Sequence, residues 1–160
     1  MKNVIIYSSK HGFTKKCAEM LKEGLKDGSN LINLKDNPII DLNDYQVIIL
    51  GSSVYAGNIQ KDMKEFINNN LKVLLEKNTG LFTCNMHKRE EAEEQLKKVF
   101  PLELIERSFV VTFFGGGFDF SKMNFIEKQI VKKIVKISEN TENIEHENIK
   151  MMQDKINSLV

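Results

Sequence analysis

The residues best suited to chemistry form a short polar segment near the start of the chain. Its small or hydroxyl-bearing members are Ser8, Ser9, Gly12 and Thr14. Backbone N–H groups of such a segment close around an anion, and Ser and Thr hydroxyls add further hydrogen-bond donors. The segment therefore predicts a binding site for a phosphate monoester.

The spacing of this segment excludes two common phosphate-binding loops. A Walker loop needs Gly-x-x-x-x-Gly-Lys-Ser/Thr and a dinucleotide-binding loop needs Gly-x-Gly-x-x-Gly, but Gly12 is the only glycine present. A strand is predicted before the segment, over Val4–Tyr7, and a helix after it. The helix is indicated by apolar residues at helical spacing, namely Cys17, Ala18, Leu21 and Leu25. An ordinary turn with Thr14 as the helix N-cap is the alternative interpretation.

A second glycine-bearing segment follows the most apolar strand of the chain. Val47–Leu50 is a continuous apolar run, which is typical of a strand buried on both faces. Gly51–Asn58 is expected to be a loop, and an amphipathic helix should follow between Met63 and Leu74. Glycine returns at 115–117, where we expect another loop after a strand.

Strands alternate with helices along the rest of the chain. Further strands are predicted at Leu31–Leu34, Thr79–Cys84 and Ser108–Phe114, and further helices at Lys88–Lys98, Met123–Ile137 and Glu147–Leu159. This alternation predicts an α/β fold, a doubly wound five-stranded parallel sheet of order 2-1-3-4-5 with helices on both faces. Residues 1–160 are expected to form a single domain. Ligands of such sheets bind at the carboxyl ends of strands one and three, which the first two glycine-bearing segments follow.

Composition narrows the class of protein. The chain has 23 basic and 22 acidic residues and a formal net charge of +1, so its charge favours neither nucleic acid nor a strongly acidic partner. Cys17 and Cys84 are expected to be reduced thiols in a cytoplasmic protein, because no secretory signal is recognisable. His11 and His87 have no second ligand at metal spacing, so no metal site is expected.

The first segment resembles the signature of the flavodoxin family. Its fixed places are filled by Ile5, Ile6, Tyr7, Ser9, Gly12, Thr14, Ala18 and Leu21. The resemblance implies FMN as cofactor, with the phosphate held by Ser9, Lys10, His11, Gly12, Phe13 and Thr14. It implies contacts to one side of the flavin ring from Ser53, Val54, Tyr55, Ala56 and Gly57, and to the other side from Asn85, Met86, Gly115 and Gly116. No catalytic side chain is expected, because the flavin carries the redox chemistry.

Nearly the whole chain, and the later part most specifically, resembles one branch, the menaquinone-dependent protoporphyrinogen oxidases. The similarity includes Glu65-Phe66 and the Lys- and Ile-rich helix that ends near Ser138. It implies an FMN-dependent oxidoreductase whose partners are a quinone and a porphyrinogen. The chain departs from that branch at Tyr55-Ala56 and at Phe118–Phe120, where the branch has arginine and tyrosine. Two alternatives stay open: a soluble electron carrier between partner proteins, and a flavin-free interaction domain.

The helix expected over Met123–Ile137 has two interpretations. Its apolar residues gather on one broad half, and Lys128, Lys132 and Lys136 form a stripe on the other. One interpretation is a helix that covers the sheet and exposes its lysines. The other is an interfacial segment, Phe118–Lys136, in peripheral contact with the inner face of the cell membrane.

Overall fold

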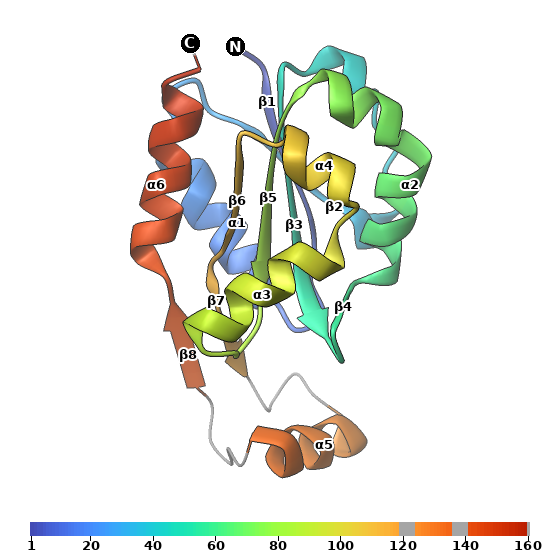
Figure 1. The fold of residues 1–160 in the computed structure, drawn as a ribbon, viewed down its shortest axis with the longest axis vertical. Helices are drawn as coiled ribbons and strands as arrows, with labels where there is room; N and C mark the ends of the chain where they lie inside the picture. Colours follow the sequence, from blue (N-terminus) through green and yellow to red (C-terminus); the bar gives the residue numbers. More distant parts are fainter. Residues whose placement is uncertain (119–123, 136–140, 160) are drawn as a thin grey trace.

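A computed structural model describes residues 1–118, 124–135 and 141–159 of the chain. Its central sheet has five parallel strands, which are β1 (Asn3–Ser8), β2 (Asn30–Asn33), β3 (Val47–Tyr55), β5 (Asn78–Cys84) and β6 (Val110–Phe113). Their spatial order is β2-β1-β3-β5-β6 (Figure 1). The predicted doubly wound order 2-1-3-4-5 is therefore confirmed.

Helices cover both faces of this sheet (Figure 1). On one side lie α1 (Phe13–Glu23) and α6 (His146–Asn157), and on the other α2 (Lys61–Glu76), α3 (Arg89–Val99) and α4 (Leu102–Arg107). The chain passes from β2 to β3 through two 3₁₀ helices, η1 (Leu34–Asp36) and η2 (Leu42–Asp44). Successive β1 side chains alternate between the two cores, so Ile5 packs with the α1 side and Ile6 with the α2 side. The segments Val4–Ile6 of β1 and Val47–Leu50 of β3 are continuously apolar because both faces of the sheet are covered.

Strand β3 is longer than the sequence pattern predicts. Most of the expected loop Gly51–Asn58 is strand, because β3 continues to Tyr55 and the short strand β4 (Asn58–Ile59) pairs back on it. Gly51 serves packing here, since a Cβ at this position would lie 2.0 Å from the Phe82 ring. The turn is reduced to Ala56 and Gly57, which both have positive φ, 51° and 78°.

The later part of the chain corrects one further expectation and adds two elements. The expected glycine loop is strand β7 (Gly115–Phe118), and the polar stretch before α6 contains strand β8 (Thr141–Ile144). These two strands pair antiparallel. Gly115 is required there, because a Cβ would lie 1.9 Å from the carbonyl oxygen of Asn143. The short helix α4 was not predicted.

Helix α5 (Phe125–Val135) is inserted between β7 and β8. It lies beyond the carboxyl ends of the sheet strands, away from the layers that cover the sheet (Figure 1). The interpretation of this segment as a sheet-covering helix is therefore wrong. Residues 119–123 and 136–137, which belong to the expected helix or membrane segment, lie outside the described residues.

Candidate functional site

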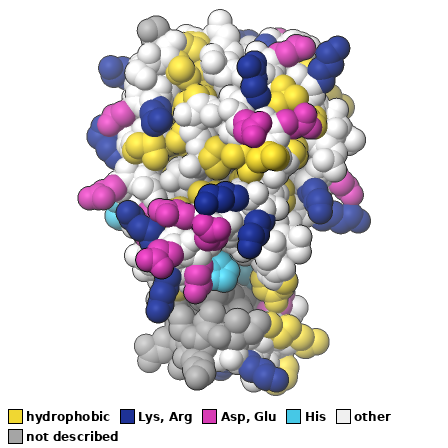
Figure 2. Space-filling view, in the orientation of Figure 1, with side chains coloured by type: hydrophobic (Ala, Val, Ile, Leu, Met, Phe, Trp, Pro, Cys, Tyr) yellow, Lys and Arg dark blue, Asp and Glu magenta, His cyan; other side chains and the backbone are white. Residues whose placement is uncertain are grey.

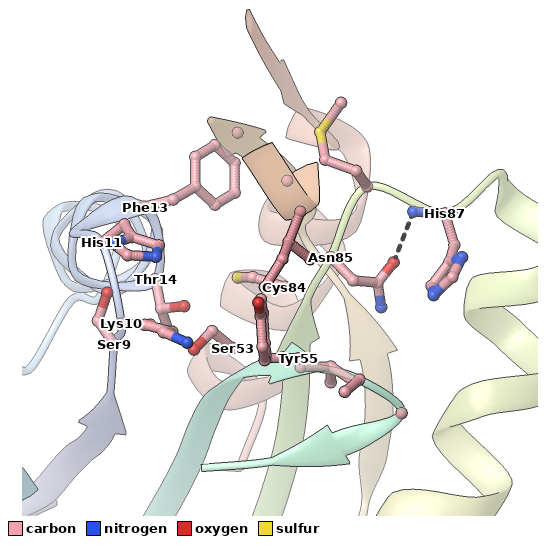
Figure 3. A pocket seen from close by; sticks show the side chains of 17 residues that line it. Ser9, Lys10, His11, Phe13, Thr14, Ser53, Tyr55, Cys84, Asn85 and His87 are labelled. Carbon is pink, nitrogen blue, oxygen red and sulfur yellow. Dashed lines mark hydrogen bonds between the residues drawn. The ribbon is translucent and has the colours of Figure 1, made fainter. Parts of the chain in front are cut away.

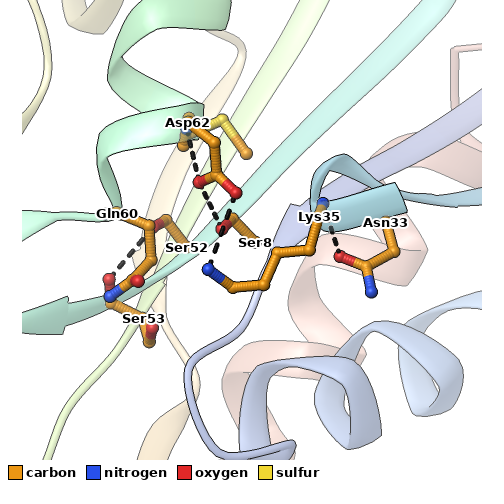
Figure 4. A network of polar contacts seen from close by, with 8 residues as sticks. Ser8, Asn33, Lys35, Ser52, Ser53, Gln60 and Asp62 are labelled. Atoms are coloured by element: carbon orange, nitrogen blue, oxygen red, sulfur yellow. Dashed lines mark hydrogen bonds and ion pairs between the residues drawn. The ribbon is translucent and has the colours of Figure 1, made fainter. Parts of the chain in front are cut away.

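The reversal of winding at β1 brings two loops to the same edge of the sheet. Ser8, the last residue of β1, is in register with Ser52 of β3. Ser8 Oγ donates a hydrogen bond to Asp62 Oδ1 at 2.5 Å, and Ser52 Oγ accepts one from the backbone N–H of Gln60 at 3.0 Å (Figure 4). Both strand ends are thereby tied to the start of α2, and the loops that follow begin from fixed positions.

The loop after β1 presents the N-terminus of α1 to a cavity. Gly12 is the N-cap, with a left-handed φ of 92°, and its N–H donates to Ser9 Oγ at 2.9 Å. The interpretation of Thr14 as N-cap is therefore wrong. No side chain caps α1, and its first turn has no acidic residue, whereas the first turns of α2 to α6 each have at least one. The first-turn N–H groups of α1 are thus suited to an external anion.

Two hydroxyl groups beside this loop are buried without a hydrogen-bond partner among the described residues. They are Thr14 Oγ1 and Ser53 Oγ. Thr14 is fully buried in the first turn of α1, and Ser53 lies on β3 across the cavity (Figure 3). A buried hydroxyl without a partner is unfavourable, so both positions are suited to a polar ligand.

The cavity has a volume of about 270 Å³. Its lining consists of Ser9, Lys10, His11, Phe13, Thr14, Ser53, Val54, Tyr55, Ala56, Gly57, Cys84, Asn85, Met86, His87, Gly116, Gly117 and Ile130 (Figure 3). Every residue predicted for the site lies on this surface except Gly12 and Gly115. Those two glycines shape the backbone next to it, through left-handed φ values of 92° each. The structure adds Cys84, His87, Gly117 and Ile130.

Tyr55 and Lys10 face each other across the cavity mouth. Lys10 Nζ lies 3.6 Å from the centre of the Tyr55 ring, a cation–π contact between the first loop and the end of β3. Phe13 and Tyr55 project from different walls (Figure 3). The cavity is therefore flanked by aromatic side chains and has a lysine ammonium on one of them.

The third wall is built from neutral groups after β5. Asn85 donates its backbone N–H to the carbonyl of Gly115 at 2.7 Å and its side-chain amide to Gln95 at 2.7 Å. Its Oδ1 accepts the backbone N–H of His87 at 3.0 Å (Figure 3). Gly116 permits this close approach, because a Cβ there would lie 2.2 Å from the Asn85 carbonyl oxygen.

Cys84 forms the floor between these walls. Its side chain is buried, and burial raises the pKa of its thiol well above the usual value. The neighbouring Cys17 thiol raises that pKa further. Cys84 is accordingly a neutral thiol at physiological pH and is unsuited to act as a nucleophile.

The described residues hold neither a metal site nor a membrane-spanning helix. They contain no group of three or more His, Cys, Asp or Glu side chains placed to hold a metal ion. None of the described helices has the length and apolar character needed to cross a bilayer.

A parallel sheet of this order, with an anion-binding loop and a cavity at the carboxyl ends of β1 and β3, defines a doubly wound α/β protein with its ligand site at the switch point. Residues 4–145 match the flavodoxin domain family, and the chain belongs to that family.

Two known proteins, from different organisms, are similar to this chain in sequence. A flavodoxin of Clostridium saccharobutylicum is 33% identical over 84 residues, which cover 50% of this chain and 52% of that protein. The protoporphyrinogen IX dehydrogenase [quinone] of Leishmania major is 20% identical over 146 residues, 86% of this chain and 63% of that protein. The chain thus spans about half of the first relative and less than two thirds of the second.

A solved structure shows the same fold. The two-electron reduced flavodoxin of Megasphaera elsdenii superposes with a TM-score of 0.55 at 18% identity. The superposition covers 78% of this chain and 89% of the other.

The Cys84 thiol leads to a prediction for stability. We expect the free energy of unfolding to fall as the pH rises above about 8.5, the pKa of a thiol in an unfolded chain. The folded protein holds the Cys84 proton more tightly, so the unfolded state binds fewer protons in this range and a higher pH favours unfolding. The slope is at most about 1.4 kcal/mol per pH unit. Urea unfolding at several pH values measures it.

The control is Cys84→Ala, which should flatten the pH dependence above about pH 8.5. Burial raises the pKa of Tyr7 above its usual value, so its phenol keeps its proton in this range. Equal slopes for the wild type and the variant would contradict the assignment of a raised pKa to Cys84.

Proposed function

We propose that this domain binds FMN in the cavity and acts as a redox protein. The observation that carries the proposal is the N-terminus of α1, which has no side-chain cap, no first-turn acid and a buried, unpartnered Thr14 hydroxyl. These are the features that a phosphate monoester satisfies. The family membership and the name of the clostridial relative, a flavodoxin, support the same cofactor.

The residues present fit the other parts of FMN as well. Ser9, Lys10, His11, Gly12, Phe13 and Thr14 would hold the phosphate end. Ser53, Val54, Tyr55, Ala56 and Gly57 would contact one side of the flavin, and Asn85, Met86, Gly115 and Gly116 the other. We propose that the aromatic ring of Tyr55 lies against the flavin face, which requires the Lys10 ammonium to move from its place on that ring.

The chain's own groups would bind and orient the cofactor, and the cofactor would supply electron and hydride chemistry. The neutral Cys84 thiol and the Asn85 amide present no charge to the cavity. The apolar side chains of Phe13, Val54 and Met86 would exclude water from the bound ring. The proposal therefore needs no side-chain nucleophile.

We further propose that the redox reaction is of the protoporphyrinogen oxidase type, with a quinone as electron acceptor. Support comes from the relative of Leishmania major, whose alignment covers 86% of this chain. An electron carrier between partner proteins is the second candidate, favoured by the relative of Clostridium saccharobutylicum.

The proposed phosphate site predicts the effect of Thr14→Val. Valine keeps the shape of the buried side chain but removes the hydroxyl, so FMN binding should weaken by about 1–3 kcal/mol, the range for a hydrogen bond to a charged group. Riboflavin lacks the phosphate and should bind the wild type and the variant equally. Titration calorimetry with both ligands measures the difference.

Ser53→Ala is the matched control, because it removes the other unpartnered hydroxyl from the proposed flavin side of the cavity. It should weaken the binding of FMN and of riboflavin by the same factor. An equal loss of affinity for both ligands in Thr14→Val would contradict the placement of the phosphate at this loop. No binding of FMN by the wild type would leave the flavin-free interaction domain.

An assay with reduced porphyrin separates the two redox candidates. The FMN-loaded protein should oxidise a porphyrinogen with many turnovers when a menaquinone analogue is present, and porphyrin fluorescence follows the reaction. A reduced flavin that transfers electrons to a protein acceptor, together with no porphyrin formation, would favour the electron carrier.

We also propose peripheral contact between α5 and an anionic membrane surface. Phe125 is 75% exposed and Ile126 69% exposed, and Lys132 and Lys133 are exposed on the same helix. Figure 2 shows hydrophobic and basic side chains together at the lower end of the molecule, where α5 lies. Exposed apolar side chains between lysines match the interface of a membrane with anionic lipids.

The membrane proposal predicts co-sedimentation with vesicles that contain phosphatidylserine, weakened by salt. Each lysine near such a surface contributes about 1 kcal/mol. Lys132→Gln with Lys133→Gln should therefore release the protein, as should Phe125→Ser with Ile126→Ser. Lys61→Gln with Lys97→Gln is the matched control, since these lysines are exposed elsewhere. Absence of binding at low salt would contradict the proposal.

A further inference from the structure

Helix α5 contacts the loop after β1 through the carboxylate of Glu127. Glu127 Oε2 lies 2.7 Å from His11 Nε2 and 3.9 Å from Lys10 Nζ. The side chains of Glu127 and His11 are 21% and 16% exposed, so this pair is largely withdrawn from water. An acidic side chain of this chain is thus held by two residues that are proposed to face a phosphate.

The position of Glu127 is fixed from its other side by Asn124. The Asn124 side-chain amide donates to Glu127 Oε1 at 2.9 Å, and its Oδ1 accepts the backbone N–H of Glu127 at 2.8 Å. This reciprocal pair caps the start of α5 and leaves Oε2 for His11 and Lys10. The carboxylate is therefore held in a defined place and does not sample the surface.

Lys10 connects the same carboxylate to the cavity. Its ammonium lies 3.6 Å from the centre of the Tyr55 ring and 3.9 Å from Glu127 Oε2. In this arrangement the ammonium is shared between a cavity wall and α5. A dianionic ligand at the first loop would attract the same ammonium.

We propose that Glu127 is an affinity-determining residue that competes with the cofactor phosphate for Lys10 and His11. The proposal rests on the proposed function, because it assumes a phosphate at the first loop. The carboxylate and the phosphate are like charges in a partly buried site, so occupancy by one disfavours the other. Bound phosphate weakens the contact of α5 with the loop, and that contact weakens phosphate binding by the same factor.

The competition acts only on ligands with an anionic end. It lowers the preference of the site for FMN over riboflavin, because riboflavin places no charge at the loop. It also makes the docking of α5 depend on the cofactor, although Ile130 is the one side chain among the described α5 residues that lines the cavity.

The test compares Glu127→Gln with the wild type by titration calorimetry. Glutamine keeps the size and the amide partner of Asn124 but removes the negative charge. FMN should bind at least about fivefold more tightly to the variant, the lower end of typical coupling between two sites. Riboflavin should bind both proteins equally.

Glu142→Gln is the matched control. Glu142 is also a carboxylate beside α1, where it pairs with Lys16 at 2.7 Å. This variant has the same change in net charge and should leave the ratio of the FMN and riboflavin dissociation constants unchanged. An equal fall of that ratio in both variants would reduce the effect to net charge and overturn the role of Glu127.

Hydrogen exchange of the α5 amides gives a readout that is independent of affinity. FMN should speed exchange in α5 of the wild type relative to riboflavin, and inorganic phosphate at high concentration should act in the same direction. In Glu127→Gln, the α5 amides should exchange fast without ligand, and FMN should not increase that exchange rate further.

The outcomes separate this inference from the proposed function. A wild type that binds FMN while Glu127→Gln binds it equally or more weakly overturns the competition and leaves the cofactor assignment intact. Slower α5 exchange with FMN than with riboflavin also overturns it, since the phosphate would then be strengthening the contact. A wild type that binds neither flavin overturns the proposed function itself.

Discussion

The site depends on one constraint, the position of β1 between β2 and β3. The chain winds to one side of β1 first and then crosses to the other, so the loops after β1 and β3 leave the sheet next to each other. Their strands are about 4.8 Å apart, as neighbouring strands are. The pairing of Ser8 with Ser52 fixes the level along the strands at which both loops begin. The anion-binding end of α1 and the aromatic end of β3 therefore share one cavity.

Local sequence patterns predicted those parts of the fold whose conformation depends on their own residues and not on a neighbouring element. The apolar run of β1 and the small residues after it are visible without knowledge of any neighbour. Gly51 was misinterpreted because a glycine ordinarily weakens a strand, whereas here it accommodates the Phe82 ring from the next strand. The left-handed conformation of Ala56 was not predicted either, since a residue with positive φ in such a turn is usually Asn, Asp or Gly.

The structure of the insertion after β6 could not be predicted from local sequence patterns. Strands β7 and β8 pair across a long sequence separation, and three glycines on one and polar residues on the other give no alternating signal. The apolar half of α5 suggested a helix packed on the sheet, but both faces are already covered by other helices. Phe13, Thr14 and Tyr55 of the candidate site were therefore predictable, while Ile130 and Glu127 were not, since their place depends on the β7–β8 pairing.

Neutral and charged groups lie on different walls of the cavity. On the β5 side, the protonated Cys84 thiol and the paired Asn85 amide bring no charge to the cavity. On the α1 side, Lys10 and His11 are charged or polar, and both contact Glu127 of the insertion. Glu127 thus adds a charged group from outside the doubly wound core to the potential around a bound cofactor. A change in the insertion alters this potential without touching the sheet, which is why one fold can support redox proteins with different partners.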